Sequence, residues 1–362
     1  MIKTISIHNF KAIQELNNIN LGKINLIGGK NNAGKSSFVE GIFLYIDRHS
    51  PDVFQKLLSW RGFPRLRIEP ESLWGPFFYD YSFSEEIFIE LFEQADTSNK
   101  SSPGEKKRLS IVYQGNHVPK VPIPINNNGM LTSSMNGGTG FHALELTHKT
   151  NETVDFLAYP LLHNGLYYEI EKNDMIKLQT GFFVGSRMFA NDDNIERLGI
   201  LEKKDEQEKI IPFLRRFEPS LTRLQVIKEG QQDIIYADLG NRKKVPVNFL
   251  GDGFCRCLTI ALLLTANTPD FLLIDEIGSG IHFSLLNTFW QFIIDTAAVT
   301  DCQIITTTHS YEMIQAFGEA MKEKSFNDAA YIRLEKQNDV VSAFQFNADE
   351  LGFALDSEME VR

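Results

Sequence analysis

The chain is poor in cysteine, with three in 362 residues, and this excludes a framework of disulfides. Cys255 and Cys257 stand one residue apart in an apolar segment, and no histidine or further cysteine lies near them. We therefore expect all the cysteines, including Cys302, to be reduced thiols in the protein core.

Long hydrophobic runs are also absent. The longest apolar stretch, around 258–264, is far shorter than the roughly 20 residues that cross a bilayer. The chain does not open with a charged and then apolar leader. We expect a cytoplasmic protein without membrane contact.

Basic residues are fewer than acidic ones, 36 against 47, and the formal net charge is −11. Proteins that coat nucleic acid do so through basic surfaces, so this balance argues against that class. The one short basic run in the middle of the chain, 106–108, is predicted to be a solvated loop. Heptad repeats of coiled-coil length are missing, whereas 43% hydrophobic residues suffice for the cores of two or three domains.

The most informative segment present is 29–36, GKNNAGKS, which fits the pattern G-x-x-x-x-G-K-[ST]. An apolar strand candidate, 24–27, precedes it, and apolar residues recur at helical spacing in 38–46. In a strand, loop and helix of this kind, the loop N–H groups and the helix N-terminus point at one spot and cradle a phosphate. Lys35 is predicted to reach the β- and γ-phosphates and Ser36 to bind Mg²⁺. The alternative is a glycine-rich turn with a solvated lysine.

A second pattern lies far down the chain, where the apolar run 271–274 ends in Asp275 and Glu276. This is typical of a buried parallel strand that delivers carboxylates to the edge of a sheet, and it fits a Walker B motif. Asp275 is predicted to hold Mg²⁺, and Glu276 to orient or deprotonate the attacking water. An ordinary strand end is the alternative.

A third strand candidate, 304–308, leads into His309 and Ser310. His309 is predicted to sense the γ-phosphate, because an imidazole can hydrogen-bond the phosphate or the water. The alternative is a histidine with a purely structural role.

The fourth segment, 250–253, has the sequence LGDG and precedes the apolar stretch 257–264. Glycines at a helix start expose N–H groups, so Gly251, Asp252 and Gly253 predict a second anion-binding helix end. Since one nucleotide already has its own glycine loop, this end is expected to complete the site of a neighbouring copy. A buried helix with a glycine-rich entry is the alternative.

In this order, the four segments resemble the ABC-type ATPase heads of SMC-like and RecF-like proteins, and more closely the stand-alone bacterial ATPases called AAA15 or OLD-type. Residues 5–11 are similar to the opening strand of these heads, 275–282 to Walker B with the D-loop, and 358–362 to the end of the module. The resemblance implies ATP and Mg²⁺ as cofactors and Lys35, Glu276 and His309 as catalytic residues. The nucleotide-binding residues it implies are Gly29, Asn31, Asn32, Ala33, Gly34, Lys35, Ser36, Ser37, Gly251, Asp252 and Gly253.

Some positions depart from the family pattern. Gly251 stands where transporter-type heads have a serine, and Gly278 stands where many relatives have a further glutamate. Gly253 and backbone amides would therefore contact the neighbour's γ-phosphate, and Glu276 is left as the base. For the glutamine that contacts Mg²⁺ in the family, Gln94 and Gln114 are both candidates.

The spacing of the motifs predicts an insertion, because Lys35 and Asp275 are about 240 residues apart. We expect an α/β fold in which 1–51 and 182–362 form the ABC-type head, split by a β-containing insertion at 52–181. Within the insertion, 86–91 and 109–113 are strand candidates and 114–116 is turn-like. The stretches 101–104, 126–129 and 133–138 have loop compositions.

In the second part of the head, the patterns predict helices at 205–216 and 311–324. They also predict strands at 224–227 and 234–237, and a closing hairpin of 331–334 and 340–346 with a turn at 337–339.

The resemblance implies a Mg²⁺-dependent ATPase that dimerises head to head as a nucleotide-gated switch. Stand-alone ATPases of this kind resemble components of anti-phage defence systems, PARIS-type and retron-associated ones included, which hold or trigger a separately encoded effector. A TOPRIM-type nuclease is one candidate for this partner. No intrinsic nuclease is expected, since only about 50 residues follow His309. The alternative is a RecF-like repair ATPase that loads on DNA, which the acidic charge and the Gly-Asp-Gly loop fit less well.

Overall fold

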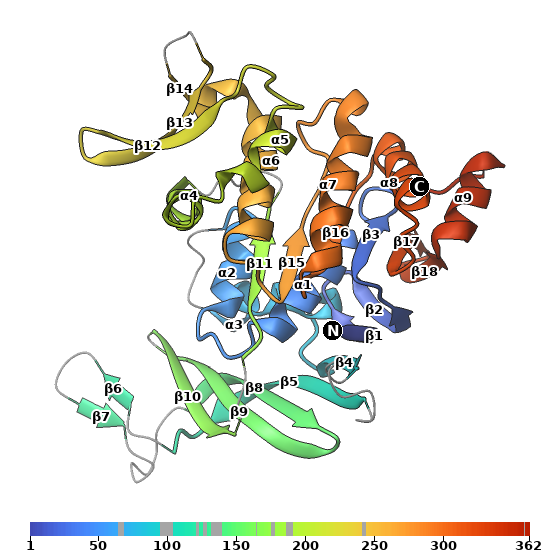
Figure 1. Cartoon of the computed structure of the whole chain (residues 1–362). Coiled ribbons are helices and arrows are strands. Elements are labelled where there is room, and N and C mark those ends of the chain that lie inside the picture. The colour runs from blue at the N-terminus through green and yellow to red at the C-terminus, as the bar shows by residue number, and fades with distance from the viewer. Residues whose placement is uncertain are drawn as a thin grey trace. The chain divides into compact units, whose positions relative to one another are not determined.

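A computed structural model describes residues 1–63, 69–94, 104–120, 123–125, 129–131, 140–163, 165–174, 178–185, 191–240, 244–357 and 359–362 (Figure 1). The contacts between residues divide the chain into two compact units. Unit 1 comprises Met1–Leu21, Asn32–Gln179 and Leu334–Ala343, and unit 2 comprises Gly22–Asn31, Thr180–Arg333 and Phe344–Arg362. The boundary after Asn31 lies inside the glycine loop.

Unit 1 is built on a seven-stranded antiparallel sheet with the strand order β10-β9-β8-β5-β4-β1-β2. Alternation sets the faces of these strands, since in β4 the side chains of Ile87, Ile89 and Leu91 are buried in turn. The strands are β1 (Ile2–Phe10), β2 (Ile13–Asn20), β4 (Ile87–Glu93), β5 (Glu105–His117), β8 (Phe141–Thr150), β9 (Thr153–Leu162) and β10 (Leu166–Asn173).

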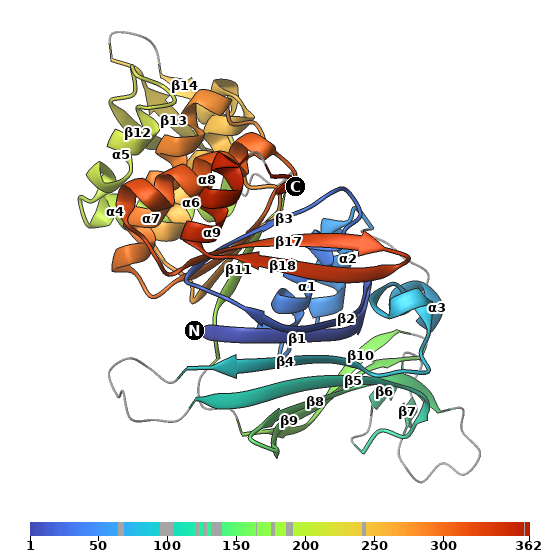
Figure 2. The ribbon, with the colours of Figure 1, turned by 90° about the vertical axis from the view of Figure 1, so that its right-hand side faces the viewer.

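Strands from the predicted insertion pair directly with the start of the chain. Figure 2 shows β4 between β1 and β5, and β4 is antiparallel to both. Strands β4, β5, β8, β9 and β10 thus share one sheet with β1 and β2. The boundaries of the insertion at 52 and 181 stay a prediction.

The helices of unit 1 include α1, whose Gly41 lets the helix approach β1, because a Cβ there would lie 3.0 Å from Ile7 Cδ1. This confirms the helix expected after the glycine loop. The helices are α1 (Lys35–Ile46), α2 (Val53–Trp60) and α3 (Pro70–Leu73). The shorter elements are the 3₁₀ turns η1 (Gly75–Phe77) and η2 (Tyr79–Tyr81) and the hairpin β6 (Ile123–Ile125) and β7 (Gly129–Leu131).

The basic run 106–108 was wrongly predicted to be a loop, because it lies in β5. Lys106 pairs with Glu90 at 3.0 Å and Lys107 with Glu93 at 2.8 Å, both on the neighbouring β4. These cross-strand partners are far away in the sequence, so no local pattern reveals them. The predicted turn at 114–116 is also wrong, since β5 continues through it.

The loop-like stretches of the insertion lie mostly outside the described residues, namely 101–103, 126–128 and 133–138. Gly104 precedes β5 and Gly129 opens β7.

Unit 2 is built on a six-stranded sheet with the order β11-β15-β16-β3-β17-β18, in which the first five strands are parallel. Every residue of β3, β15 and β16 is buried, as expected for a parallel sheet covered on both faces. The strands are β3 (Ile24–Gly28), β11 (Gly181–Val184), β15 (Phe271–Ile274), β16 (Gln303–Thr307), β17 (Ala329–Gln337) and β18 (Val340–Phe346). The tip of the β17–β18 hairpin, Leu334–Ala343, belongs to unit 1.

Helices with apolar faces supply the core of unit 2, which contains Phe289 and Trp290 at 0% exposure. Figure 1 shows α6, α7 and α8 alongside the strands. The helices are α4 (Asn191–Lys203), α5 (Ile211–Leu214), α6 (Asp252–Thr265), α7 (Leu286–Val299), α8 (Tyr311–Lys324) and α9 (Ala348–Asp356). Short 3₁₀ turns are η3 (Gln207–Lys209), η4 (Val247–Leu250) and η5 (Phe283–Leu285).

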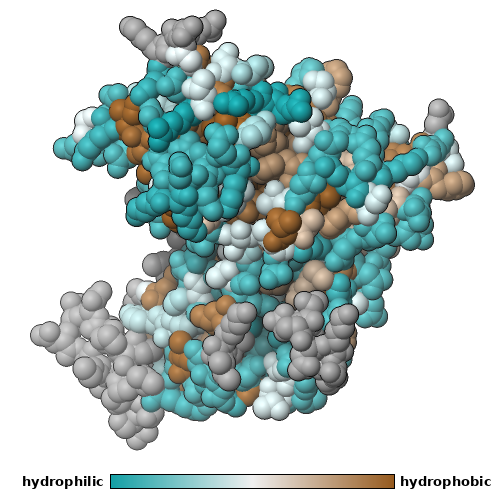
Figure 3. Space-filling view, viewed as in Figure 1, coloured by the Kyte–Doolittle hydropathy of each residue, from teal (hydrophilic) through white to brown (hydrophobic). Residues whose placement is uncertain are grey.

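A small antiparallel sheet completes unit 2, with β12 (Arg223–Glu229), β13 (Gln232–Asp238) and β14 (Val245–Pro246). It confirms the strands predicted around 224–227 and 234–237. Figure 3 shows hydrophilic surface over α4, which opens with Asp192 and Asp193.

Two further predictions are confirmed and one is wrong. The helix at 311–324 is α8, and the closing hairpin is β17 and β18, with Asn338 and Asp339 in left-handed conformations in its turn. The predicted helix at 205–216 is instead η3 followed by α5, with the longer α4 before them.

The described helices reach 14 residues at most, so no long coiled coil is present in this part of the chain. Across the same residues, no helix combines the length and apolarity needed to span a membrane. All the cysteines are buried and free, as predicted.

Candidate functional site

The carboxyl ends of β3, β15 and β16 lie at one edge of the sheet of unit 2. The three strands are parallel and paired in register, so the residues that follow them share this edge. These residues are 29–31 of the glycine loop after β3, 275–276 after β15 and 308–310 after β16. Within unit 2, the fold therefore brings the start of the first motif to the second and third.

Thr307, the last residue of β16, orients the acidic turn after β15. Its hydroxyl donates to Asp275 Oδ1 at 2.6 Å and accepts the backbone N–H of Glu276 at 2.8 Å. Thr307 is fully buried. No sequence pattern singled out this residue, although it lies in the run predicted as the third strand.

Glu276 and His309 form a close pair. Glu276 Oε2 lies 2.7 Å from His309 Nδ1, with 27% of the glutamate side chain and 62% of the histidine side chain exposed. An ionised carboxylate accepts only, so Nδ1–H donates and Nε2 can bind a second group. The backbone of Glu276 has φ 52°, a left-handed conformation that is rare outside glycine and is concentrated at functional sites.

Arg256 on α6 ties the helix after the Gly-Asp-Gly loop to the acidic turn. Its guanidinium donates to the carbonyls of Asp275 at 2.5 Å, Gly185 at 3.1 Å and Ile277 at 3.2 Å. The side chain is 6% exposed. A buried arginine bound to three carbonyls fixes their positions, and the sequence signal for it was the one basic residue of α6.

The Gly-Asp-Gly loop packs against the segment after Glu276. A Cβ on Gly253 would lie 2.1 Å from the carbonyl oxygen of Gly280, so only glycine allows this approach. Gly251 has φ 91°, and a Cβ there would meet no atom within 4 Å, while Asp252 opens α6 on the exposed side. Gly253 thus has a role inside its own chain, and a substitution there would disturb the loop as well as any contact with a neighbour.

Gly278, which stands where the family pattern has a glutamate, faces the flexible end of the Met313 side chain. A Cβ at this position would lie 2.6 Å from Met313 Cε on α8. Gln114, one of the two glutamine candidates, is engaged on the sheet of unit 1, where its amide donates to Glu145 and contacts His117 Nδ1 at 3.2 Å. Gln94 follows β4 directly.

Tyr331 packs against the residue that precedes the glycine loop. A Cβ on Gly28 would lie 2.1 Å from the Tyr331 hydroxyl, which donates to the carbonyl of Val361. Tyr331 and Val361 are both fully buried. The last residue of β3 must therefore be glycine, and the segment around Val361 holds the ring in place.

The second half of the glycine loop and the first turn of α1 belong to unit 1. Gly34 precedes Lys35, the first residue of α1, with φ 94°, and Asn32 has φ 62°. These left-handed residues are the backbone conformation that a phosphate-binding loop uses to turn its N–H groups inward. Ala33, Ser36 and Ser37 accompany them, and Lys35 is 7% exposed.

Each unit carries an oxygen donor of the kind that Mg²⁺ uses beside a nucleotide. Among the described residues, no group of three or more His, Cys, Asp or Glu is arranged around one point. Mg²⁺ in nucleotide sites takes one or two protein oxygens and completes its shell with phosphates and waters. Ser36 at the start of α1 in unit 1 and Asp275 after β15 in unit 2 are oxygen donors of this kind, each placed within its own unit.

The chain matches one sequence family over part of its length, and it is similar to individual relatives over longer or shorter segments. Residues 148–314 match the family described as "AAA domain, putative AbiEii toxin, Type IV TA system". The chain is 23% identical over 356 residues to an "ATP/GTP phosphatase" of Helicobacter pylori, covering 94% of this chain and 93% of that protein. A 98-residue part is 33% identical to the uncharacterized protein MJECL11 of Methanocaldococcus jannaschii, covering 27% of this chain and 86% of the archaeal protein.

Solved structures of SMC heads have a similar fold. One is an SMC head bound to the C-winged helix domain of ScpA, with a TM-score of 0.51, 13% identity, and 96% of this chain and 97% of that chain covered. Another is an Smc head with an extended coiled coil bound to the C-terminal domain of ScpA derived from Pyrococcus furiosus, with a TM-score of 0.50, 11% identity and 99% of both chains covered. At these identities the likeness concerns the fold alone, and it confirms the α/β fold of ABC-type ATPase heads.

Proposed function

We propose that the chain, which belongs to the same family as MJECL11, is an ATPase of the AAA and SMC-head type that acts as a Mg²⁺-dependent, nucleotide-gated, dimerising switch. The observation that carries the proposal is the Glu276–His309 pair, at the sheet edge where the glycine loop begins. In this proposal the Glu276 carboxylate, held by His309, is the general base, and Thr307 fixes the backbone N–H of the same residue.

In this proposal, the N–H groups of 29–34 and the ammonium of Lys35 bind the phosphates of ATP. Ser36 and Asp275 hold Mg²⁺, which when bound neutralises charge that develops on the phosphates. Glu276 accepts a proton from the attacking water, and His309 holds the carboxylate in place through Nδ1. Nε2 of His309 is then available to the γ-phosphate, as proposed for its sensing role.

The switch is proposed to be a head-to-head dimer with ATP between two copies. Gly251 and Asp252 support this, because they lie exposed at the N-terminus of the 14-residue helix α6. SMC heads supply the fold for such an arrangement. We further propose that the dimer holds or activates a separately encoded effector in anti-phage defence, which the family description supports through its mention of a toxin system. Residues 52–181 are the proposed partner-binding region.

Nucleotide binding is the first experiment. Lys35→Ala should abolish binding of Mg-ATP to the purified chain, because the loop loses the lysine that reaches the phosphates. Lys30→Ala is the matched control, since it removes the same charge from a variable position of the same loop. Equal binding by both variants would contradict the assignment of Lys35.

Association is the second experiment. Sedimentation of the full chain should show a dimer with Mg-ATP and a monomer with Mg-ADP, and Glu276→Gln should strengthen the ATP-bound dimer because hydrolysis is blocked. A single species under all conditions would contradict the switch. Sub-micromolar binding of short DNA duplexes at about 150 mM salt, tighter than ordinary non-specific binding, would favour a DNA-loading ATPase instead.

A further inference from the structure

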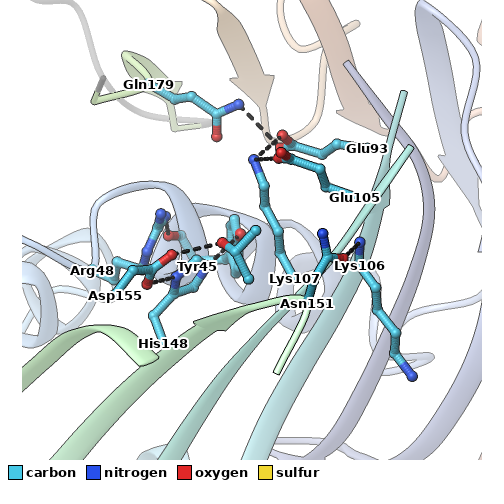
Figure 4. Close-up of polar contacts among 11 residues, drawn as sticks. Tyr45, Arg48, Glu93, Glu105, Lys106, Lys107, His148, Asn151, Asp155 and Gln179 are labelled. Atoms are coloured by element: carbon cyan, nitrogen blue, oxygen red, sulfur yellow. Dashed lines mark hydrogen bonds and ion pairs between the residues drawn. The ribbon is translucent and has the colours of Figure 1, made fainter. Parts of the chain in front are cut away.

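The sheet of unit 1 reaches α1 through a buried chain of hydrogen bonds. The Tyr45 hydroxyl, on the last turn of α1, lies 2.8 Å from Nε2 of His148 on β8. Nδ1 of the same ring lies 2.5 Å from Oδ1 of Asp155 on β9, and Thr150 donates to the other oxygen of that carboxylate at 2.6 Å. Figure 4 shows Tyr45, His148 and Asp155 pointing toward one another. Helix and hairpin are therefore joined by polar side chains.

The protonation of the groups decides which of them donates in each of these hydrogen bonds. Hydrogen bonds and nearby positive charge keep the pKa of Asp155 below its usual range despite the burial that opposes them, so the carboxylate is ionised and can only accept. His148 Nδ1–H must then donate. Burial lowers the pKa of His148 to about 4, so its ring is neutral and Nε2 accepts from the Tyr45 hydroxyl. Each hydrogen bond from Tyr45 through His148 to Asp155 thus has a fixed donor and a fixed acceptor.

Two further contacts hold the same end of the helix. The Tyr168 hydroxyl on β10 donates to the carbonyl of Arg48 at 3.4 Å, and the His49 ring stands edge-on to Phe156 of β9 with centroids 4.5 Å apart. Strands β8, β9 and β10 thus each contact the segment 45–49.

Burial makes the Tyr45–His148 contact rigid. Tyr45 is 0% exposed and His148 is 1% exposed, so water cannot replace either partner. An unpaired buried polar group is unfavourable, and fully satisfied buried networks fix a unique geometry. A movement of the β8–β9 hairpin must therefore move Tyr45 with it.

α1 carries that movement to the phosphate-binding loop. Tyr45 lies ten residues after Lys35, about 15 Å along one continuous helix in unit 1. Because an α-helix of three turns moves as a rigid rod, the position of Tyr45 sets the position of Lys35 and Ser36 in the first turn.

We propose that Tyr45 and His148 are positioning residues for nucleotide binding, through which the β8–β9 hairpin sets the phosphate affinity of the first turn of α1. This inference rests on the proposed function, since it assumes that Lys35 and Ser36 bind a nucleotide. It goes beyond that function because it names the part of the sheet, Phe141–Leu162, whose position changes the affinity of the nucleotide site. Coupling of this kind is reciprocal, so the nucleotide also stabilises the hairpin.

A second tyrosine–histidine pair in the same unit provides a matched control. The Tyr113 hydroxyl, on β5, lies 2.6 Å from Nδ1 of His142 on β8. This pair has the same chemistry and shares β8, but neither residue lies on α1. Tyr113→Phe thus removes an equal hydroxyl without loosening the helix.

The experiment compares Tyr45→Phe and Tyr113→Phe in the full chain, with a fluorescent ATP analogue and Mg²⁺ as the probe. Tyr45→Phe should weaken binding about five-fold or more, the lower end of typical coupling between sites, whereas Tyr113→Phe should stay within about two-fold of wild type. His148→Gln should bind better than His148→Ala, because the amide can accept from Tyr45 and donate to Asp155. A purely structural pair would lower thermal stability in both tyrosine variants and leave both affinities alike.

Hydrogen exchange tests the reciprocal effect. Mg-ATP should slow amide exchange in Phe141–Leu162 of the wild-type chain, and this protection should be lost in Tyr45→Phe but kept in Tyr113→Phe. If the wild-type chain binds no nucleotide, the proposed function fails and the inference fails with it. If wild type binds and the two tyrosine variants behave alike, the inference alone is overturned.

Discussion

Two histidine–carboxylate pairs in this molecule have the same chemistry and opposite surroundings. His309 and Glu276 are 2.7 Å apart at the sheet edge of unit 2, with 62% and 27% of their side chains exposed. His148 and Asp155 are 2.5 Å apart in unit 1, with 1% and 20% exposed. The exposed pair can meet a substrate and exchange protons with water, whereas the buried histidine can do neither and instead fixes a helix to a sheet. Burial, and not residue type, separates a chemical role from a positioning role.

The largest expected effect comes from removing the charge of each carboxylate. Glu276→Gln should reduce ATP turnover about 100-fold to 10,000-fold, the usual contribution of a general base. Asp155→Asn should leave turnover at saturating ATP within about three-fold, because a lost positioning contact changes affinity more than the chemical step. Steady-state phosphate release measures both, and equal losses would erase the distinction between the pairs.

Removal of the histidines should affect stability in the opposite order to turnover, with the larger loss at the buried pair. His148→Ala leaves the Tyr45 hydroxyl buried without this partner and takes a hydrogen bond from the Asp155 carboxylate, so it should lower the free energy of unfolding by about 2–4 kcal/mol. His309→Ala, at an exposed site, should change it by about 0.5 kcal/mol or less. Urea unfolding with an unchanged slope is the measurement, and a His309 effect as large as the His148 effect would contradict it.

The buried pair should also make the fold sensitive to acid. Burial, and then the positive charge of Arg48, lowers the pKa of His148 to about 4, and the pKa of His49 falls to about 4 for the same reasons. Because histidine in an unfolded chain has a pKa near 6.5, the unfolded state binds more protons between about pH 6.5 and 4. The groups around His148 are Tyr45, Arg48, His49, Lys107 and Asp155.

The contribution of His148 to the free energy of unfolding should therefore be fully present above about pH 6.5. It should decrease toward pH 4, by up to about 1.4 kcal/mol per pH unit. Unfolding by urea across this range measures the slope, and His148→Gln should flatten it. A wild-type stability that is constant between pH 6.5 and 4 would show that the ring is not buried in neutral form.

A smaller effect is expected from the threonines of β16. Thr307→Val removes the hydroxyl that binds Asp275 and should lower turnover about ten-fold, as is usual for groups that orient a metal ligand. Thr306→Val is the control, since its hydroxyl donates to the carbonyl of Asn25 at 3.2 Å and does not touch the acidic turn. ATPase assays at several Mg²⁺ concentrations should separate the two, and matching losses would assign Thr307 to the fold alone.

Several strands and helices of unit 2 could be predicted because their signals are local, although the helix expected at 205–216 is η3 followed by α5. The apolar run 271–274 has the same bounds as strand β15. The helix predicted at 311–324 has the same bounds as α8. Asp275, Glu276 and His309 could be named because each directly follows such a strand. Sequence patterns of about ten residues are therefore sufficient to predict these elements and the site residues that follow them.

The rest depends on contacts between distant residues. Arg256 is the one basic residue of α6, and only the fold shows the three carbonyls that it binds. Tyr45 and His148 are 103 residues apart, and no local pattern links a helix end to a strand in the predicted insertion. The prediction for the run 106–108 failed because its glutamate partners lie on another strand.

The most direct test of the central claim, that Glu276 and His309 act together on the substrate, is a double-mutant cycle in single-turnover phosphate release. Glu276→Gln, His309→Ala and the double variant are compared with wild type under Mg-ATP. The account predicts that the double variant is about as slow as Glu276→Gln alone, because residues that act as a unit are not additive. Effects that multiply, or a Glu276→Gln variant with the wild-type rate, would contradict it.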